Sequence, residues 1–286
     1  MDAGLPRLLI TRAVEQALAE DLGTRGDITT DATVAADAQA VATFGARRAG
    51  VISGLAVAEA AFQTLDARAV FEPLVADGDR VGAGTVVARV SGPARVLLTG
   101  ERVALNFLCH MSGIASLTSR YVDTVAGTRA RIIDTRKTTP GLRAFEKYAV
   151  RCGGGFNHRS GLYDAILIKD NHIVAAGGIE AAITAARAHA GHMVKIEVEV
   201  DDLDGLASAL KHVIDAVLLD NMDPATLKRA VEMVRGRALT EASGGVNLDT
   251  VRAIAESGVD LISVGALTHS APILDLGLDF VPPTAP

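Results

Sequence analysis

Polar and charged side chains follow a series of short apolar runs in the second half of the sequence. Six runs are visible, RIID, AILIKD, VKIEVEV, AVLLD, ALTEASGG and LISVG, and stretches with a helical pattern separate them. The residues at their ends are 134–137 (DTRK), 169–172 (KDNH), Glu197 with Glu199, 220–221 (DN), 241–245 (EASGG) and 265–266 (GA). Strand–helix alternation of this kind produces a parallel sheet, so the strand ends meet at one edge. We expect these side chains to form one rim, where barrel enzymes carry their active sites.

Two of these endings have the composition of phosphate-binding loops. In SGGVNLD, the glycines let backbone N–H groups approach an anion, and we expect the following helix to start near Asn247. In VGALTHS, the last strand ends in a second loop that contains glycine. Loops after the final two strands are a recurrent phosphate site in barrels, although either loop could also be a plain strand-to-helix turn. The predicted phosphate-binding residues are Ser243, Gly244, Gly245, Ser263, Gly265 and Ala266.

Cationic residues at the same rim predict an anionic ligand. They are Arg136, Lys137, His158, Arg159 and Lys169, with Arg102 contributed by a preceding helix. Arginine has a planar fork that suits carboxylates, whereas lysine is a compact charge that suits phosphate or a developing anion. Arg102 taken alone is equally compatible with a salt bridge on a helix surface. The set as a whole predicts a ligand with several carboxylate and phosphate groups.

Two carboxylates end neighbouring strands of the predicted barrel. Glu199 and Asp220 could accept hydrogen bonds from ribose hydroxyls or help to hold a divalent metal. No cluster of His and Cys accompanies them, so the sequence favours weakly held Mg²⁺, bound mainly by substrate phosphates, over a tightly bound transition metal.

The first half of the chain predicts a separate domain of α/β sandwich type. A helix is expected near residues 7–21, and residues 77–98 alternate apolar and polar residues with glycines at the turns. This β segment has the pattern of a lipoyl or biotinyl carrier, but no lysine precedes Lys137, so no carrier lysine is present. A linker helix over 101–125 leads into the barrel. We expect an N-terminal domain over 1–115, with the tail of about 270–286 packing back on it, and an incomplete α/β barrel over 116–270.

Composition excludes several classes of protein. The net charge of -6 argues against binding to nucleic acid, which needs an extended basic face. The two cysteines, Cys109 and Cys152, are too few for a disulfide framework and lack zinc-site spacing. The first residues do not have the pattern of a signal peptide, and no stretch is long and apolar enough to span a membrane. These features predict a cytoplasmic enzyme.

The motifs together resemble the quinolinate phosphoribosyltransferase family. The resemblance covers nearly the whole chain and rests above all on DTRKTTPGLR and GGGFNHRSGLYD. It implies phosphoribosyl transfer from phosphoribosyl pyrophosphate to quinolinate with loss of CO₂, giving nicotinate mononucleotide and pyrophosphate. It also implies a homodimer in which each site borrows Arg102 from the partner.

The resemblance also implies a role for each candidate residue. Quinolinate would be bound by Arg102, Arg136, His158, Arg159 and Lys169. Ribose and phosphate would be bound by Thr135, Lys137, Glu199, Asp220, Ser243, Gly244, Gly245, Ser263, Gly265 and Ala266. Lys137, Lys169, Glu199 and Asp220 would act in catalysis, and Mg²⁺ would be the cofactor.

Three other functions remain open from the sequence. A paralogue associated with molybdenum transport would share the fold and use another substrate. An aldolase would form a Schiff base on Lys169, although the surrounding arginines make this chemistry a poor match. A sensor of phosphate ligands would bind without turnover.

Overall fold

The chain divides into two compact units, and neither is one continuous stretch. The structure is a computed structural model that describes residues 4–282. Among the described residues, the first unit comprises 4–117, 144–154 and 271–282, and the second comprises 118–143 and 155–270. The sequence-based boundaries of 1–115 and 116–270 did not foresee that 144–154 would belong to the first unit. Residues 1–3 and 283–286, which the sequence analysis assigned to the N-terminal domain and its tail, lie outside the described residues.

The first unit contains an antiparallel sheet of four strands. Its strand order is β12-β1-β5-β3, and β2 and β4 form a separate short pair. The strands are β1 (Gln39–Ala46), β2 (Gly50–Val51), β3 (Val70–Pro73), β4 (Arg80–Val81), β5 (Val86–Pro93) and β12 (Leu276–Phe280). The helices are α1 (Arg7–Leu22), α2 (Ile28–Thr33), α3 (Leu55–Leu65), α5 (Arg143–Cys152) and the greater part of α4 (Ala94–Thr124). The helix expected near 7–21 is therefore present as α1.

Alternation of side chains gives the sheet one buried face. In β1, Ala42, Phe44 and Ala46 are buried, as a period of two residues requires. The Phe44 ring lies 6.0 Å from the Phe62 ring of α3, measured between centroids. The hydrophobic core of this unit therefore lies between the sheet and α3.

Helix α4 runs from the first unit into the second. Leu105, Leu108, Cys109 and Ile114 of this helix are all buried. The helix begins at Ala94, so the last residues of the predicted β segment over 77–98 are helical.

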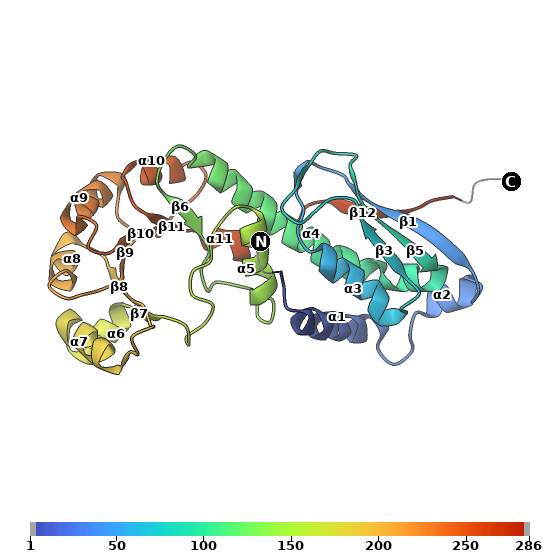
Figure 1. Ribbon diagram of the computed structural model, residues 1–286, viewed down its shortest axis with the longest axis horizontal. Coiled ribbons are helices and arrows are strands. Elements are labelled where there is room, and N and C mark those ends of the chain that lie inside the picture. Colours follow the sequence, from blue (N-terminus) through green and yellow to red (C-terminus); the bar gives the residue numbers. More distant parts are fainter. Residues whose placement is uncertain (1–3, 283–286) are drawn as a thin grey trace. The chain divides into compact units, whose positions relative to one another are not determined.

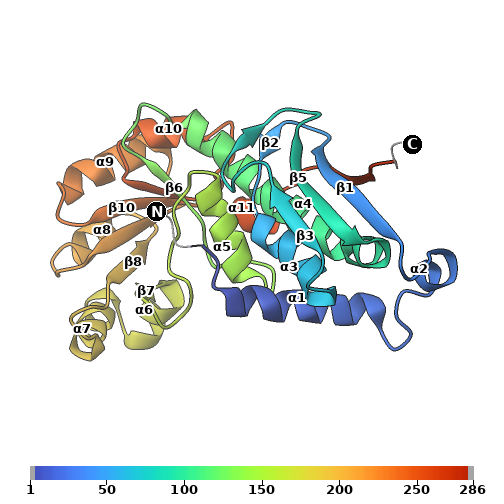
Figure 2. The ribbon, with the colours of Figure 1, turned by 45° about the vertical axis from the view of Figure 1, so that its right-hand side comes forward.

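The second unit is an open barrel of six parallel strands. Their order is β6-β11-β10-β9-β8-β7. The strands are β6 (Arg131–Ile133), β7 (Ile166–Ile168), β8 (Ile196–Val200), β9 (Ala216–Asp220), β10 (Leu239–Ser243) and β11 (Leu261–Ser263). The helices are α6 (Asp170–Ala176), α7 (Ile179–His189), α8 (Leu203–Ala209), α9 (Pro224–Val234), α10 (Val251–Glu256) and α11 (Ala266–His269). Figures 1 and 2 show α7, α8, α9 and α10 outside the strands. The predicted incomplete barrel is confirmed.

The edge strands of this barrel are β6 and β7. At β6, a single parallel bridge joins Ile133 to Phe156, so the loop after α5 lies where another strand would pair.

Helix α9 shows how capping residues define where a helix begins. Asp223 caps α9 by accepting hydrogen bonds from Ala225 N and Thr226 N, and Pro224 follows as the first helical residue.

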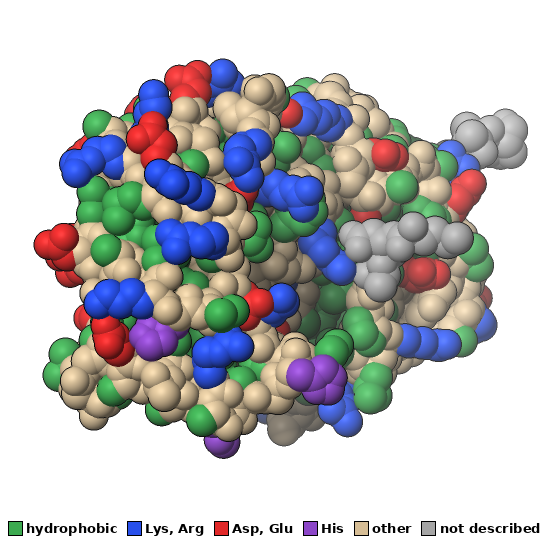
Figure 3. Space-filling view, turned by 60° about the vertical axis from the view of Figure 1, so that its left-hand side comes forward, with side chains coloured by type: hydrophobic (Ala, Val, Ile, Leu, Met, Phe, Trp, Pro, Cys, Tyr) green, Lys and Arg blue, Asp and Glu red, His purple; other side chains and the backbone are tan. Residues whose placement is uncertain are grey.

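The surface carries charges of both signs. On the face in Figure 3, Lys and Arg side chains are interspersed with acidic and uncharged ones. Within residues 4–282, no helix combines the length and the apolar character needed to cross a bilayer.

Gly113 of α4 provides a test of packing in the first unit. A Cβ atom there would lie 2.8 Å from Ile273 Cα and would also clash with the Pro272 carbonyl oxygen. Alanine is the better helix former by about 1 kcal/mol, so helix propensity alone predicts that Gly113→Ala stabilises the protein. We expect the clash with backbone atoms to reverse the sign and to lower the free energy of unfolding by about 1–3 kcal/mol.

Thermal or urea unfolding of Gly113→Ala measures this effect. Gly191→Ala is the matched control, because no heavy atom lies within 4 Å of a Cβ atom at that position. A Gly113→Ala protein that matches Gly191→Ala in stability would contradict the expected clash.

Candidate active site

A cavity of about 580 Å³ opens at the carboxyl ends of the six barrel strands. Its volume falls in the range of small-molecule sites, roughly 300–1,000 Å³. The lining residues are Thr135, Arg136, Lys137, His158, Arg159, Leu167, Lys169, Glu199, Leu218, Asp220, Asn221, Glu241, Ser243, Gly244, Gly245 and Ser263. The structure thus brings together the predicted site residues except Gly265, Ala266 and Arg102.

Two arginines enter this cavity with unused hydrogen-bonding capacity. The Nε atoms of Arg136 and Arg159 are buried and have no hydrogen-bond partner among the described residues. Arg159 also donates from Nη1 to the Ala165 carbonyl at 3.0 Å, which fixes its side chain. Burial, and secondarily the charge of Arg136, lowers the pKa of Arg159. Buried donors of this kind carry a desolvation cost that an anionic ligand would remove.

Carboxylates lie beside these cations. Lys169 Nζ lies 3.1 Å from Glu199 Oε2, and His158 Nε2 lies 3.0 Å from Glu197 Oε2 and 3.7 Å from Glu241 Oε2. Burial, followed by the nearby Glu197 charge, raises the pKa of Glu241 well above its usual range. Glu241 therefore keeps a proton at a pH where an exposed glutamate is ionised.

The ring of His158 has a defined tautomer. The Arg159 backbone N–H donates to His158 Nδ1 at 2.6 Å, so Nδ1 is an acceptor and Nε2 carries the hydrogen of the neutral ring. That Nε2–H points to Glu197. Both ring nitrogens are thus engaged, and a substrate carboxylate that bound His158 would have to displace one of these contacts.

The same tautomer bears on metal binding. The ligand atoms of His158, Glu197 and Glu241 lie within 4.8 Å of one another, close enough to surround an ion. An imidazole nitrogen binds a metal only when it carries no proton, and here Nε2 is the protonated one. The arrangement therefore favours a hydrogen-bonded cluster over a metal centre.

Asp134 holds the loop that carries His158. Its side chain is fully buried at the end of β6, and it accepts hydrogen bonds from Asn157 Nδ2 at 2.6 Å and from His158 N at 2.8 Å. A loop from elsewhere in the sequence is fixed in this way to the first strand of the barrel.

Arg143 is a supporting residue that the sequence analysis did not single out. Its guanidinium donates to Thr138 Oγ1 at 3.0 Å and to the Ser160 carbonyl at 3.1 Å. It therefore connects the loop after β6 with the loop of His158 and Arg159. Its position in the run DTRKTTPGLR was the only signal available, because its contact with the second loop is made to Ser160, 17 residues further along the chain.

The loop after β10 needs its glycines. Gly244 has φ +92°, and a Cβ atom there would lie 3.0 Å from Asn221 N and would clash with the Asn221 side chain; Gly245 has φ +62°.

The prediction of a helix start near Asn247 was wrong, because α10 begins at Val251. Asn247 instead accepts hydrogen bonds from Asp249 N and Thr250 N, which form a turn.

The loop after β11 lies beside Lys137. A Cβ atom at Gly265 would lie 3.1 Å from Lys137 Cδ. Thr268 Oγ1 of α11 donates to the Lys137 carbonyl at 2.7 Å, so this short helix holds the backbone of the lysine. Ala266 is the first residue of α11.

Arg102 belongs to the first unit. It lies on α4 with 65% of its side chain exposed, and its guanidinium is 3.8 Å from Glu101 Oε1. The cavity residues all belong to the second unit.

Comparison with known proteins adds an independent observation. Two family models match: the N-terminal domain of quinolinate phosphoribosyl transferase over residues 27–112 and its C-terminal domain over residues 114–279. A probable carboxylating nicotinate-nucleotide pyrophosphorylase of Bacillus subtilis (strain 168) is 42% identical, and the alignment covers 95% of this chain and 93% of that protein. The carboxylating nicotinate-nucleotide pyrophosphorylase of Mycobacterium leprae (strain TN) is 47% identical, with coverage of 93% and 95%.

A solved structure agrees with these relatives. The nicotinate-nucleotide pyrophosphorylase from Francisella tularensis superimposes with a TM-score of 0.90 at 39% identity, covering 97% of this chain and 98% of that one. Both halves of the sequence and the whole fold therefore lead to the same assignment, and the chain belongs to the quinolinate phosphoribosyltransferase family.

Proposed function

We propose that this protein transfers the phosphoribosyl group of phosphoribosyl pyrophosphate to quinolinate and releases CO₂, giving nicotinate mononucleotide and pyrophosphate for NAD biosynthesis. The observation that carries the proposal is the pair of buried, unpartnered guanidinium nitrogens of Arg136 and Arg159 in a cavity that also holds Lys137 and the glycine loop after β10. This donor set suits a ligand with two carboxylates and a second ligand with phosphates. The names of the relatives support the same reaction.

In this mechanism the cations fix the orientation of the pyridine ring. Its two carboxylates are bound by Arg136, Arg159 and Lys169, and His158 contacts the same carboxylates. The ring nitrogen then faces the anomeric carbon of the ribose. Orientation alone can lower a barrier by about 7–11 kcal/mol in ideal cases. The Ser243–Gly245 loop and the Ser263–Ala266 segment bind the 5′-phosphate.

The bond changes balance without an added oxidant or reductant. The ring nitrogen forms a bond to the anomeric carbon, and the bond from that carbon to the diphosphate oxygen breaks with its electron pair on oxygen. Lys137 stabilises the negative charge on the leaving group. The alkylated ring is cationic, so the carbon that loses CO₂ keeps the electron pair as a stabilised ylide and then takes up a proton.

The carboxylates at the rim fit the predicted Mg²⁺. One or two carboxylates together with substrate phosphates would hold Mg²⁺, which when bound would supply positive charge to the diphosphate. Asp220 and Glu199 line the cavity, and Glu199 is also paired with Lys169. The two carboxylates would help to hold the ion or accept hydrogen bonds from the ribose hydroxyls.

The proposal includes a homodimer in the cytoplasm. Arg102 is largely exposed and belongs to the first unit, and the family resemblance assigns it to the site of the partner subunit. The free thiols of Cys109 and Cys152 are compatible with a reducing compartment.

A coupled assay of CO₂ and pyrophosphate release tests the function. We expect the purified protein to release both products in equal amounts from quinolinate and phosphoribosyl pyrophosphate, and we expect EDTA to stop the reaction until Mg²⁺ is restored. A protein that binds both substrates without releasing pyrophosphate would be a sensor. Reduction with borohydride would trap a carbonyl substrate on Lys169 if the protein were an aldolase.

Removal of either cavity arginine should stop catalysis and leave the fold intact. We expect Arg136→Ala and Arg159→Ala to lower kcat/KM for quinolinate at least about 100-fold, since each loses charge-assisted hydrogen bonds to a carboxylate. Arg229→Ala is the control, because Arg229 is exposed on α9 in the same unit. Unchanged kcat/KM in either cavity variant, with circular dichroism like that of wild type, would remove that arginine from the site.

The glycine loop after β10 should control binding of the phosphate-bearing substrate. We expect Gly244→Ala to raise KM for phosphoribosyl pyrophosphate more than about tenfold, since its positive φ and its contact with Asn221 force the loop to move. Gly236→Ala introduces similar backbone strain at φ +74° in open space, away from the cavity. If both variants raised KM equally, general destabilisation would explain the effect and the loop would have no specific role.

A further inference from the structure

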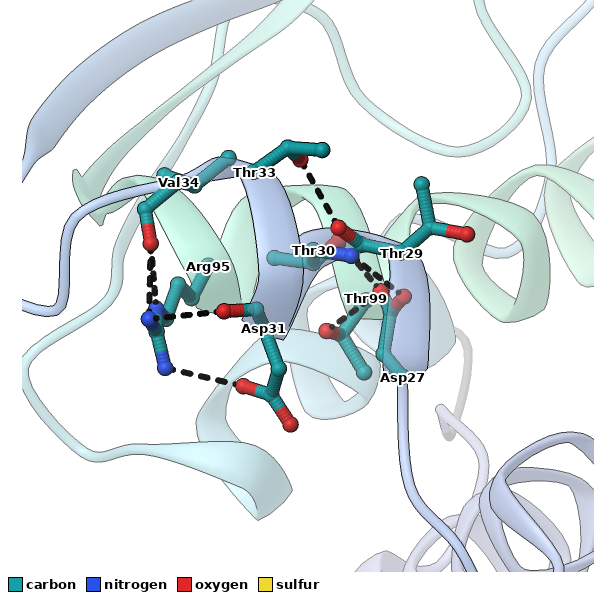
Figure 4. A network of polar contacts seen from close by, with 8 residues as sticks. All are labelled: Asp27, Thr29, Thr30, Asp31, Thr33, Val34, Arg95 and Thr99. Carbon is teal, nitrogen blue, oxygen red and sulfur yellow. Dashed lines mark hydrogen bonds and ion pairs between the residues drawn. The ribbon is translucent and has the colours of Figure 1, made fainter.

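Asp27, in the run DLGTRGDITT that the proposed reaction does not use, connects helix α2 with helix α4 (Figure 4). Asp27 caps α2 by accepting hydrogen bonds from Thr30 N at 2.9 Å and Thr30 Oγ1 at 2.5 Å. The same carboxylate accepts a hydrogen bond from Thr99 Oγ1 of α4 at 3.0 Å. One side chain therefore ties the start of α2 to α4.

The far end of α2 is tied to the same face of α4. Arg95 donates to the Val34 carbonyl from Nε at 2.9 Å and from Nη2 at 2.7 Å, and its Nη1 donates to Asp31 Oδ1 at 2.8 Å. Arg95 and Thr99 are four residues apart, so they lie on one face of the helix. We call these contacts of Asp27 and Arg95 the α2 clasp; it braces the first two turns of α4.

The carboxylate of this clasp is ionised at neutral pH. The hydroxyl and the backbone N–H of Thr30, and after them the Thr99 hydroxyl, lower the pKa of Asp27. Hydrogen bonds to an ionised acceptor are roughly twice as strong as those between neutral groups. The link from Asp27 to Thr99 is therefore stronger than an ordinary contact between two hydroxyl groups.

Arg102 lies directly beyond the clasp on the same helix. It follows Thr99 by three residues, so the two side chains are neighbours on the surface of α4. Between them, Gly100 packs on α3 without clearance, because a Cβ atom there would lie 2.8 Å from Phe62 Cδ1. The segment that carries Arg102 is thus fixed by α3 and by the α2 clasp, whereas the arginine itself is 65% exposed.

We propose that Asp27 and Thr99 are positioning residues that fix the direction of Arg102 and thereby set the affinity of the partner subunit's cavity for the pyridine dicarboxylate. The inference rests on the proposed sharing of Arg102 between subunits. It gives the α2 clasp a role in substrate binding at a site to which neither residue belongs.

Steady-state kinetics of Thr99→Val test this role. Loss of one hydrogen bond should raise KM for quinolinate about fivefold, with kcat and KM for phosphoribosyl pyrophosphate near wild type. Thr99→Ser keeps the hydroxyl and should restore the wild-type value. Thr33→Val is the control, because Thr33 is exposed on α2 and, among the described residues, its hydroxyl donates to the Thr29 carbonyl of the same helix. An unchanged KM for quinolinate in Thr99→Val, or an equal rise for both substrates, overturns the proposal.

Mixed dimers separate this proposal from the proposed function. Arg102→Ala and Arg136→Ala chains, mixed after unfolding and refolding, should regain about a quarter of wild-type activity, because half of the dimers are hybrids with one intact site each. Adding Thr99→Val to the Arg136→Ala chain, which supplies Arg102 to that site, should raise KM for quinolinate about fivefold. Adding it to the Arg102→Ala chain should not.

The outcomes of these mixtures are distinct. Activity with the same KM in all mixtures overturns the positioning role of the α2 clasp and leaves the shared site intact. No recovery of activity in any mixture overturns the shared site, and the positioning role with it.

Discussion

The structure of the second unit depends on one constraint. It must hold several cations in one cavity before an anionic ligand binds. Like charges repel, and burial disfavours the charged form of each group. Arg159 experiences both effects, since burial and Arg136 lower its pKa. Opposing charges come from the strands themselves: Glu199 lies 3.1 Å from Lys169 Nζ, and the charge of Glu197 partly offsets the lowering of the Arg159 pKa. Carboxylates at the strand ends therefore balance part of the cationic charge in the cavity.

The parallel topology by itself brings the cations and the carboxylates together. Each strand ends at the same edge, so one or two residues per strand suffice to build the cavity. The loops that carry Arg136 and Arg159 are then fixed by a few hydrogen bonds: Asp134 holds the His158 loop, and Arg143 connects that loop to the one after β6. His158 is the centre of this support, because each atom of its ring that can bond has a defined partner.

The sequence predicted those site residues whose place in the fold follows from their position at the end of a strand. The six apolar runs became six strands, and each strand contributes at least one polar residue at or after its end to one cavity, because the ends of parallel strands meet at the same edge of the sheet. Features that depend on distant partners could not be predicted. No local pattern places α5 in the first unit, pairs Asp27 with Thr99, or assigns Arg143 its contacts. The start of α10 was misplaced because Asn247, a good capping residue, forms a turn before the helix.

The pairing of β12 with β1 also has a consequence for folding during synthesis. The second unit ends at Ser270, whereas the sheet of the first unit needs the strand Leu276–Phe280 beside Gln39–Ala46. The residues of the barrel are therefore synthesised before β12, and one edge of β1 stays unpaired until Leu276–Phe280 has emerged from the ribosome. An unpaired edge is prone to join other chains, so this interval is the stage at which nascent molecules are most exposed to misassembly.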